Sequence, residues 1–197
     1  MTDTKALELA QDEKTAVDIL DELAGNDDDN VRRALANNPN ASTDILDKLS
    51  DDACPFVRVR VAAHIKTSSQ TLDKMSKDES EFVREFVAEH PSTSVETLVA
   101  LSEDRQIISW VAGNINTPVE ILNKLSSDLD EFVRISVAVN PTTTVEILDT
   151  LSKDESVNVR AAVAKNPIVP LEILDALSQD EHEDVRNIVA EHPSKGN

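Results

Sequence analysis

The sequence is poor in the residues on which several common protein classes depend. Its 197 residues include one cysteine, three glycines, one tryptophan, four phenylalanines and no tyrosine. A lone Cys54 excludes an intrachain disulfide and a cysteine-based metal site. With so little glycine, the chain has few residues for tight β-hairpin turns or phosphate-cradling loops, so neither strands nor a nucleotide site is expected.

Long apolar runs and basic residues are scarce as well. No run is long enough to span a bilayer, and residues 1–12 lack the basic start and apolar centre of an export signal, so a cytoplasmic protein without a membrane partner is expected. Acidic residues outnumber basic ones by 38 to 19, which gives a net charge of −19. Nucleic-acid binding needs a basic stripe and is therefore disfavoured. The acidity serves solubility or attracts a basic partner protein.

One motif recurs through most of the chain. Its clearest copy is Asp154–Pro167, in which an Asp is followed six residues later by an Arg, then by Val-Ala and an Asn-Pro pair. The position of the Arg recurs at intervals of 26 residues, with one interval of 24, and holds Arg32, Arg58, Arg84, Ile108, Arg134, Arg160 and Arg186. A period in this range predicts a solenoid, whose stacked units share one core and form a single domain. The predicted organisation is a lead-in at 1–12, repeats at 13–38, 39–64, 65–90, 91–114, 115–140, 141–166 and 167–192, and a tail at 193–197.

Each repeat contains two apolar segments with helical spacing. In 143–152, Val145, Leu148 and Leu151 recur every third residue, and in 157–166, Val159 and Val163 are four residues apart. Asp154 is a plausible N-cap for the second segment. Helices this short do not persist alone in water, so they must be stabilised by neighbouring repeats. The fold class predicted is all-α, without a β-sheet.

The phrase N-P-x-T-x-x-E-I-L-x-x-L-S-x-D-x-x-x-x-V-R-x-x-V-A-x-N resembles the leucine-rich repeat variant family and is related to HEAT repeats. The resemblance covers 13–192 and implies a right-handed superhelix of α-helices alternating with shorter, partly 3₁₀ helices. The founding type of the family has a cysteine-rich iron–sulfur segment ahead of its repeats. Residues 1–12 contain no cysteine, so no cluster or other cofactor is implied here. The repeats are also slightly long for the family, which would allow both helices to be α.

Three ladders of equivalent residues are candidates for structure or for function. Because catalysis needs one constellation and these groups recur, we interpret the Asp–Arg ladder as structural, each Asp joining the turn of its repeat to the Arg behind it. Its members are Asp52, Arg58, Asp78, Arg84, Asp128, Arg134, Asp154, Arg160, Asp180 and Arg186. The position after the second valine holds alanine in every repeat, which predicts close packing of adjacent helices. The Asn/His ladder, Asn38, His64, His90, Asn114, Asn140, Asn166 and His192, can satisfy backbone groups at helix ends, and no further ligand joins His64 and His90 to make a metal site.

The fourth repeat departs from the pattern. It is two residues short, has Ile108 in place of Arg, and carries Trp110 in the slot that holds Phe86 one repeat earlier. These two aromatics either fill the space left by the deletion or anchor a partner. The second interpretation gives a candidate protein-binding surface at Val59, Phe86, Trp110, Ile135 and Val139.

We therefore expect a non-enzymatic module with no catalytic residues, metal or cofactor, which binds another protein along the inner helix surface of its central repeats. An acidic surface that docks a basic partner, and a structural spacer that self-associates end to end, are the alternatives.

Overall fold

The computed structural model describes residues 2–195, in which fifteen α-helices, one 3₁₀ helix and no strand are present. The predicted all-α, helical-repeat solenoid fold is confirmed. Residue 1 of the predicted lead-in and residues 196–197 of the predicted tail lie outside the described range. In chain order the elements are α1 (Asp3–Gln11), α2 (Val17–Leu23), α3 (Asp29–Ala36), α4 (Thr43–Leu49), α5 (Pro55–Ala63), α6 (Ser69–Met75), α7 (Glu81–Glu89), α8 (Val95–Leu101), α9 (Ile108–Gly113), α10 (Val119–Leu125), α11 (Glu131–Val139), α12 (Val145–Leu151), α13 (Val157–Lys165), α14 (Leu171–Leu177), α15 (Glu183–Glu191) and η1 (Pro193–Lys195).

Each predicted repeat contributes an A helix of seven residues and a B helix of six to nine. The A helices are the even-numbered α2 to α14 and the B helices the odd-numbered α3 to α15. Both kinds are α-helical, whereas the family resemblance implied that one of them would be partly 3₁₀. The prediction of Asp154 as an N-cap is wrong: Ser156 caps α13, and Asp154 accepts a hydrogen bond from the Ser156 N–H at 2.8 Å while its side chain faces the preceding repeat.

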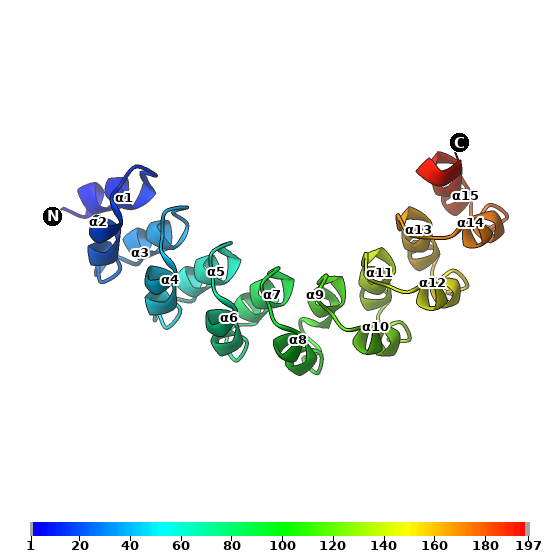
Figure 1. Ribbon diagram of the computed structural model, residues 1–197, viewed down its shortest axis with the longest axis horizontal. Helices are drawn as coiled ribbons and strands as arrows, with labels where there is room; N and C mark the ends of the chain where they lie inside the picture. The colour runs from blue at the N-terminus through cyan, green and yellow to red at the C-terminus, as the bar shows by residue number, and fades with distance from the viewer. Residues whose placement is uncertain (1, 196–197) are drawn as a thin grey trace. The chain divides into compact units, whose positions relative to one another are not determined.

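The chain divides into two compact units, residues 1–97 and 98–197, which are described separately. In the first unit α1, α3, α5 and α7 pack one after another in a row, and the A helices α2, α4 and α6 form a second row beside them (Figure 1). In the second unit α9, α11, α13 and α15 pack in the same way, and α10, α12 and α14 form the second row (Figure 1). The prediction that all repeats belong to one domain stays a prediction. No helix in residues 2–195 is long and apolar enough to cross a membrane.

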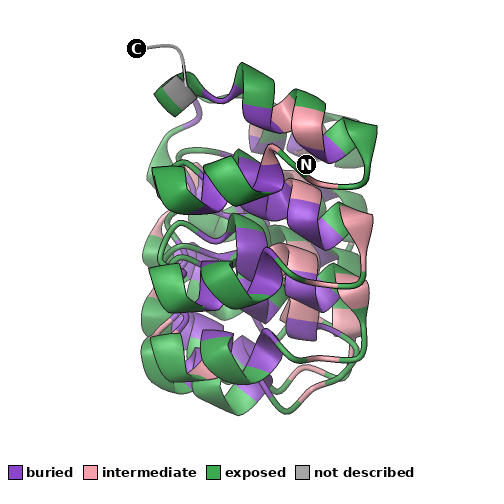
Figure 2. Ribbon diagram, turned by 90° about the vertical axis from the view of Figure 1, so that its right-hand side faces the viewer, coloured by how far each residue is buried: buried purple, intermediate pink, exposed green. Residues whose placement is uncertain are grey.

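Aliphatic side chains fill the space between the helices. Buried residues lie on the helix sides that face one another, and exposed residues cover the outside (Figure 2). The predicted core residues Val83 and Val87 are fully buried. The alanine slot is fully buried wherever another B helix follows within the same unit, which confirms close packing there (Ala36, Ala62, Ala112, Ala138 and Ala164). Since a larger side chain would push adjacent helices apart, this slot accepts only a methyl group.

The predicted lead-in is itself a B helix. Ala10 of α1 lies 26 residues before Ala36 and is fully buried like the alanines of later repeats. The side-chain amide of Asn38 donates to the Ala10 carbonyl at 2.8 Å and to the Asp12 carbonyl at 3.2 Å. Asn140 makes the same pair of bonds to the Ala112 and Asn114 carbonyls. The first helix thus completes a half repeat against which repeat 13–38 stacks.

Candidate functional site

The Asp–Arg ladder joins neighbouring repeats. The Nε of Arg58 donates to Asp78 Oδ2 at 2.7 Å and its Nη2 to Asp78 Oδ1 at 2.9 Å, a two-point ion pair across 20 residues. Within its own repeat, Arg58 donates through Nη1 to the Asp52 carbonyl oxygen at 2.7 Å. The expectation that each Arg pairs with the carboxylate six residues earlier is therefore wrong, because only the backbone of that Asp lies within reach. The same geometry recurs in Arg32–Asp52, Arg134–Asp154 and Arg160–Asp180.

These ion pairs shift the pKa values of the aspartates and arginines in the ladder. Burial by itself raises the pKa of the Asp78 carboxyl, but hydrogen bonds from Arg58 and from the Ser80 N–H outweigh it and hold that pKa below its ordinary value. The hydrogen bond to Asp78 likewise raises the pKa of Arg58. Each carboxylate is fully engaged by a guanidinium and a backbone N–H, so the ladder stabilises the stack and offers no acid or base for catalysis.

The fourth repeat keeps the ion pair by another route. Ile108, in the arginine slot, is 5% exposed and packs in the core. Arg105, three residues earlier, instead donates through both terminal nitrogens to the Asp128 carboxylate. Its side chain is 61% exposed, whereas the other ladder arginines that pair with a carboxylate are 9–16% exposed. The deletion thus moves the cation outward while the inter-repeat bond survives.

The Asn/His ladder is a second connection between repeats. His64 Nε2 bonds the Asn38 carbonyl at 3.1 Å, and His90 Nε2 bonds the His64 carbonyl at 3.1 Å. In each ring Nδ1 accepts a backbone N–H two residues on, which requires the neutral tautomer with its proton on Nε2. Burial accordingly lowers the pKa of both His64 and His90. Within residues 2–195, no group of three or more His, Cys, Asp or Glu side chains could hold a metal ion.

The predicted binding residues are exposed or half-buried residues of the B helices. In the first unit, Val59 on α5 and Phe86 on the adjacent α7 are half-buried. In the second unit, Trp110 on α9 is 43% exposed, and on the adjacent α11 Val139 is 47% exposed and Ile135 half-buried. The interpretation of Trp110 as filler for the space left by the deletion does not fit its exposure, since Ile107 and Ile108 occupy the core at that point.

Exposed phenylalanines, which were not among the predicted binding residues, occupy a position one turn before the slot of Phe86 and Trp110. Phe56, Phe82 and Phe132 each lie two residues before the ladder arginine and are 65%, 59% and 66% exposed. All five aromatic side chains of the protein are therefore on B helices and outside the core. The signal was present in the sequence, because the motif Phe-Val-Arg occurs three times at matching positions.

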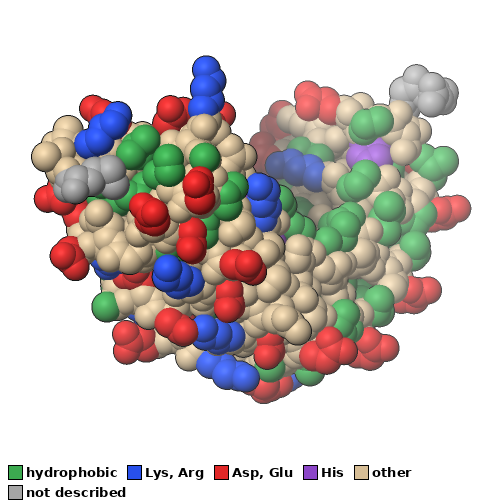
Figure 3. Space-filling view, turned by 60° about the vertical axis from the view of Figure 1, so that its left-hand side comes forward, with side chains coloured by type: hydrophobic (Ala, Val, Ile, Leu, Met, Phe, Trp, Pro, Cys, Tyr) green, Lys and Arg blue, Asp and Glu red, His purple; other side chains and the backbone are tan. Residues whose placement is uncertain are grey.

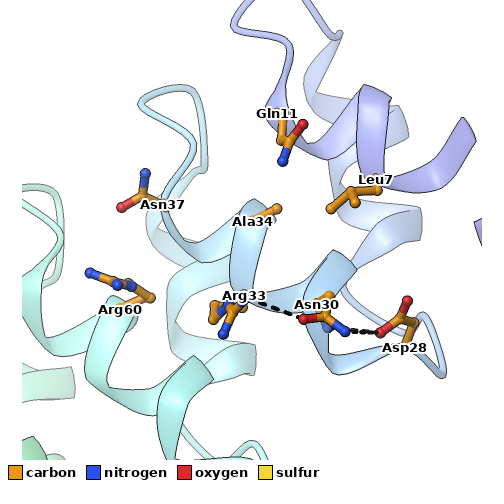
Figure 4. Close-up of a pocket in the computed structure, with 8 residues that line it drawn as sticks. All are labelled: Leu7, Gln11, Asp28, Asn30, Arg33, Ala34, Asn37 and Arg60. Carbon is orange, nitrogen blue, oxygen red and sulfur yellow. Dashed lines mark hydrogen bonds between the residues drawn. The ribbon is translucent and has the colours of Figure 1, made fainter. Parts of the chain in front are cut away.

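A depression of about 470 Å³ lies at the surface of α1, α3 and α5 (Figure 4). Arg33 and Arg60 both line it, together with Asn30, Asn37 and Asp28. Arg33 Nη2 donates to Asn30 Oδ1 at 3.1 Å, and Asn30 Nδ2 donates to Asp28 Oδ1 at 2.9 Å (Figure 4). Acidic side chains are spread over the face shown in Figure 3, with hydrophobic side chains between them. Two arginines and one carboxylate thus line this depression.

Residues 81–106 match the family model described as leucine rich repeat variant. The resemblance to this family is confirmed. The matched segment includes α7, with both Phe82 and Phe86. Among solved structures, the chain is similar to one described as a leucine-rich repeat variant with a novel repetitive protein structural motif. The two share 26% identity over 95% of this chain and 80% of that one, with a TM-score of 0.64.

Two further solved structures show weaker similarity to this chain. YibA from Escherichia coli is 19% identical over 96% of this chain and 73% of its own, with a TM-score of 0.42. A computationally designed armadillo repeat protein for modular peptide recognition is 17% identical over 94% of this chain and 95% of its own, with a TM-score of 0.35. No curated protein matches the sequence.

Proposed function

We propose that this chain is a non-enzymatic interaction module that binds a partner protein through the exposed face of its B helices. The observation that carries the proposal is the position of the aromatic residues: all five lie on B helices, and none is in the core. Aromatic side chains bury more area than any other type and dominate interface energetics. A face that holds them in water is typical of an interaction surface.

In the second unit the best anchors are on α9 and α11. Trp110 is 43% exposed, Val139 47% and Phe132 66%. Positions 132, 136 and 139 are spaced by four and three residues, which places them on one face of α11, and positions 110 and 113 are three residues apart on α9. Adjacent B helices pack side by side, so the two faces adjoin. In the first unit Val59 and Phe86 lie on the equivalent face.

The charge of the chain favours a partner with basic residues around an apolar anchor. The net charge of −19 would accelerate association with such a protein and would make the rate depend on salt. Among residues 2–195, the repeated ionisable groups serve the ladders between repeats, which supports a binding role over a catalytic one.

The test is capture of a host protein and measurement of its affinity in purified form. Trp110→Ser/Val139→Ser should weaken binding at both low and high salt. Val119→Ser/Val145→Ser is the control, because it removes similarly exposed apolar side chains, 41% and 45% exposed, from the A helices α10 and α12. If both variants bind like the wild type and salt alone releases the partner, the acidic surface is the docking site. If nothing binds and the mass in solution rises with concentration, the end-to-end spacer replaces this proposal.

A further inference from the structure

The depression at α1, α3 and α5 contains two arginines that the fold does not use. Arg33 and Arg60 are exposed and form no ion pair with any residue in 2–195. Arg33 is held by the neutral side chain of Asn30, and the Asp28 carboxylate that also lines the depression already accepts from the Asn30 N–H and Nδ2 at 2.9 Å. In Figure 4, Arg60 lies on the side of Arg33 away from Asp28. Unpaired guanidinium groups at this place are suited to bind a carboxylate.

The next repeat adds an apolar subsite at the corresponding position. Arg60 on α5 and Phe86 on α7 both lie two residues after the arginine slot, and α5 packs against α7. Packed helices are separated by about 8–10 Å, and an extended peptide advances about 3.3 Å per residue. A peptide that crosses these two helices therefore covers one repeat with about three residues.

We propose that residues 1–97 bind an extended acidic segment of the partner, with an Asp or Glu side chain between Arg33 and Arg60 and a large apolar residue about three positions away on Phe86. This inference rests on the proposed function and specifies the kind of peptide segment that residues 1–97 would bind. Phe82, one helical turn before Phe86 and 59% exposed, extends the apolar subsite. Because the chain carries a net charge of −19, its surface as a whole repels acidic peptides, so binding of an acidic peptide would be selective for this place.

The experiment is a selection of random displayed peptides against the full chain, followed by affinity measurements on the recovered sequences as C-terminal amides. We expect enriched peptides with Asp or Glu about three residues from a large apolar residue. Arg33→Gln/Arg60→Gln should weaken their binding about tenfold and remove the preference for acid. Phe86→Ala should remove the preference for the apolar residue and leave the acidic one.

The matched control is Lys48→Gln/Lys74→Gln. It removes the same charge from the A helices α4 and α6 of repeats 39–64 and 65–90, where the lysines are 52% and 43% exposed. Equal losses in the control and in the arginine variant would overturn the inference, because long-range charge would then explain the binding. It is also overturned if enriched peptides lack the acidic residue, or if inorganic phosphate displaces them where acetate at equal ionic strength does not. Partner binding that still depends on Trp110 in any of these cases would leave the proposed function standing.

Discussion

Replacing Asp154 with Asn is expected to destabilise the second unit strongly, although the change keeps the shape of the side chain. Asp154 accepts from Arg134 Nε at 2.7 Å and Nη2 at 2.9 Å, and both side chains are 9% exposed. An amide provides only one acceptor oxygen, and its NH₂ group would point a donor at a donor. The variant would therefore leave the Arg134 charge poorly solvated and without a counter-ion between two repeats.

The magnitude follows from the burial of this pair. Removal of one partner from a buried ion pair costs about 3–5 kcal/mol, whereas an exposed pair contributes about 0.2–1 kcal/mol. Because Asn keeps one hydrogen bond and the pair is not fully enclosed, a loss of about 3 kcal/mol in the free energy of unfolding is expected. The control is Asp149→Asn, which breaks the Lys153–Asp149 pair at 2.8 Å, where the side chains are 70% and 54% exposed.

Urea unfolding followed by circular dichroism measures both variants, and hydrogen exchange locates the loss. Repeat stacks are stabilised by the contacts between nearest neighbours, so α11 and α13 should lose amide protection first. If Asp154→Asn and Asp149→Asn unfold at the same urea concentration, the ladder contributes no more than a surface pair. The assignment of the ladder to repeat stacking would then be wrong.

Three further predictions concern single groups. Burial lowers the pKa of His64 and His90 in the folded protein. Below the ordinary histidine pKa of about 6.5, the unfolded state therefore binds more protons than the folded state, and the free energy of unfolding should fall as the pH drops through that value. Urea unfolding above and below that pH checks this, and His64→Asn/His90→Asn, which has the residue of other repeats, should flatten the dependence. Arg105→Gln should lower the free energy of unfolding far less than Asp154→Asn in the same assay because Arg105 is 61% exposed, and the pKa of the Asp128 carboxyl should rise in an NMR titration. Trp110 fluorescence should be readily quenched by acrylamide; strongly blue-shifted, protected emission would contradict its exposure.

The periodic part of the fold was predictable because the same physical requirement recurs in every repeat. A fully buried slot that faces a neighbouring helix admits one size of side chain, so the alanines and valines of the motif identify the stack directly. Leu9-Ala10 carries the same signal 26 residues before Leu35-Ala36, although residues 1–12 lack the arginine and the Asn-Pro pair by which to recognise a B helix.

The partners of the ladder could not be predicted because sequence distance misleads in a stack. The carboxylate six residues before Arg58 is nearer along the chain, but Asp78, 20 residues later, is nearer in space. The replacement of the fourth arginine by Arg105 depends on how a shortened turn places its side chains, which the spacing alone does not determine. The exposure of Trp110 could not be predicted either, because its slot lies at the border of core and surface.

Positions that vary from repeat to repeat are the candidates for binding a partner. Slots that stack are filled nearly identically, because every neighbour imposes the same constraint. The slot two residues after the ladder arginine holds Ala34, Arg60, Phe86, Trp110, Ser136, Ala162 and Ile188. These residues differ in size, charge and aromaticity, although the backbone presents them at equivalent places on successive B helices. Ala162 is 5% exposed and Ile188 packs against the core of the second unit, so packing constrains those two residues. None of Arg60, Phe86 and Trp110 is buried, so substitutions of these three should change the affinity for the proposed partner while the fold is left intact.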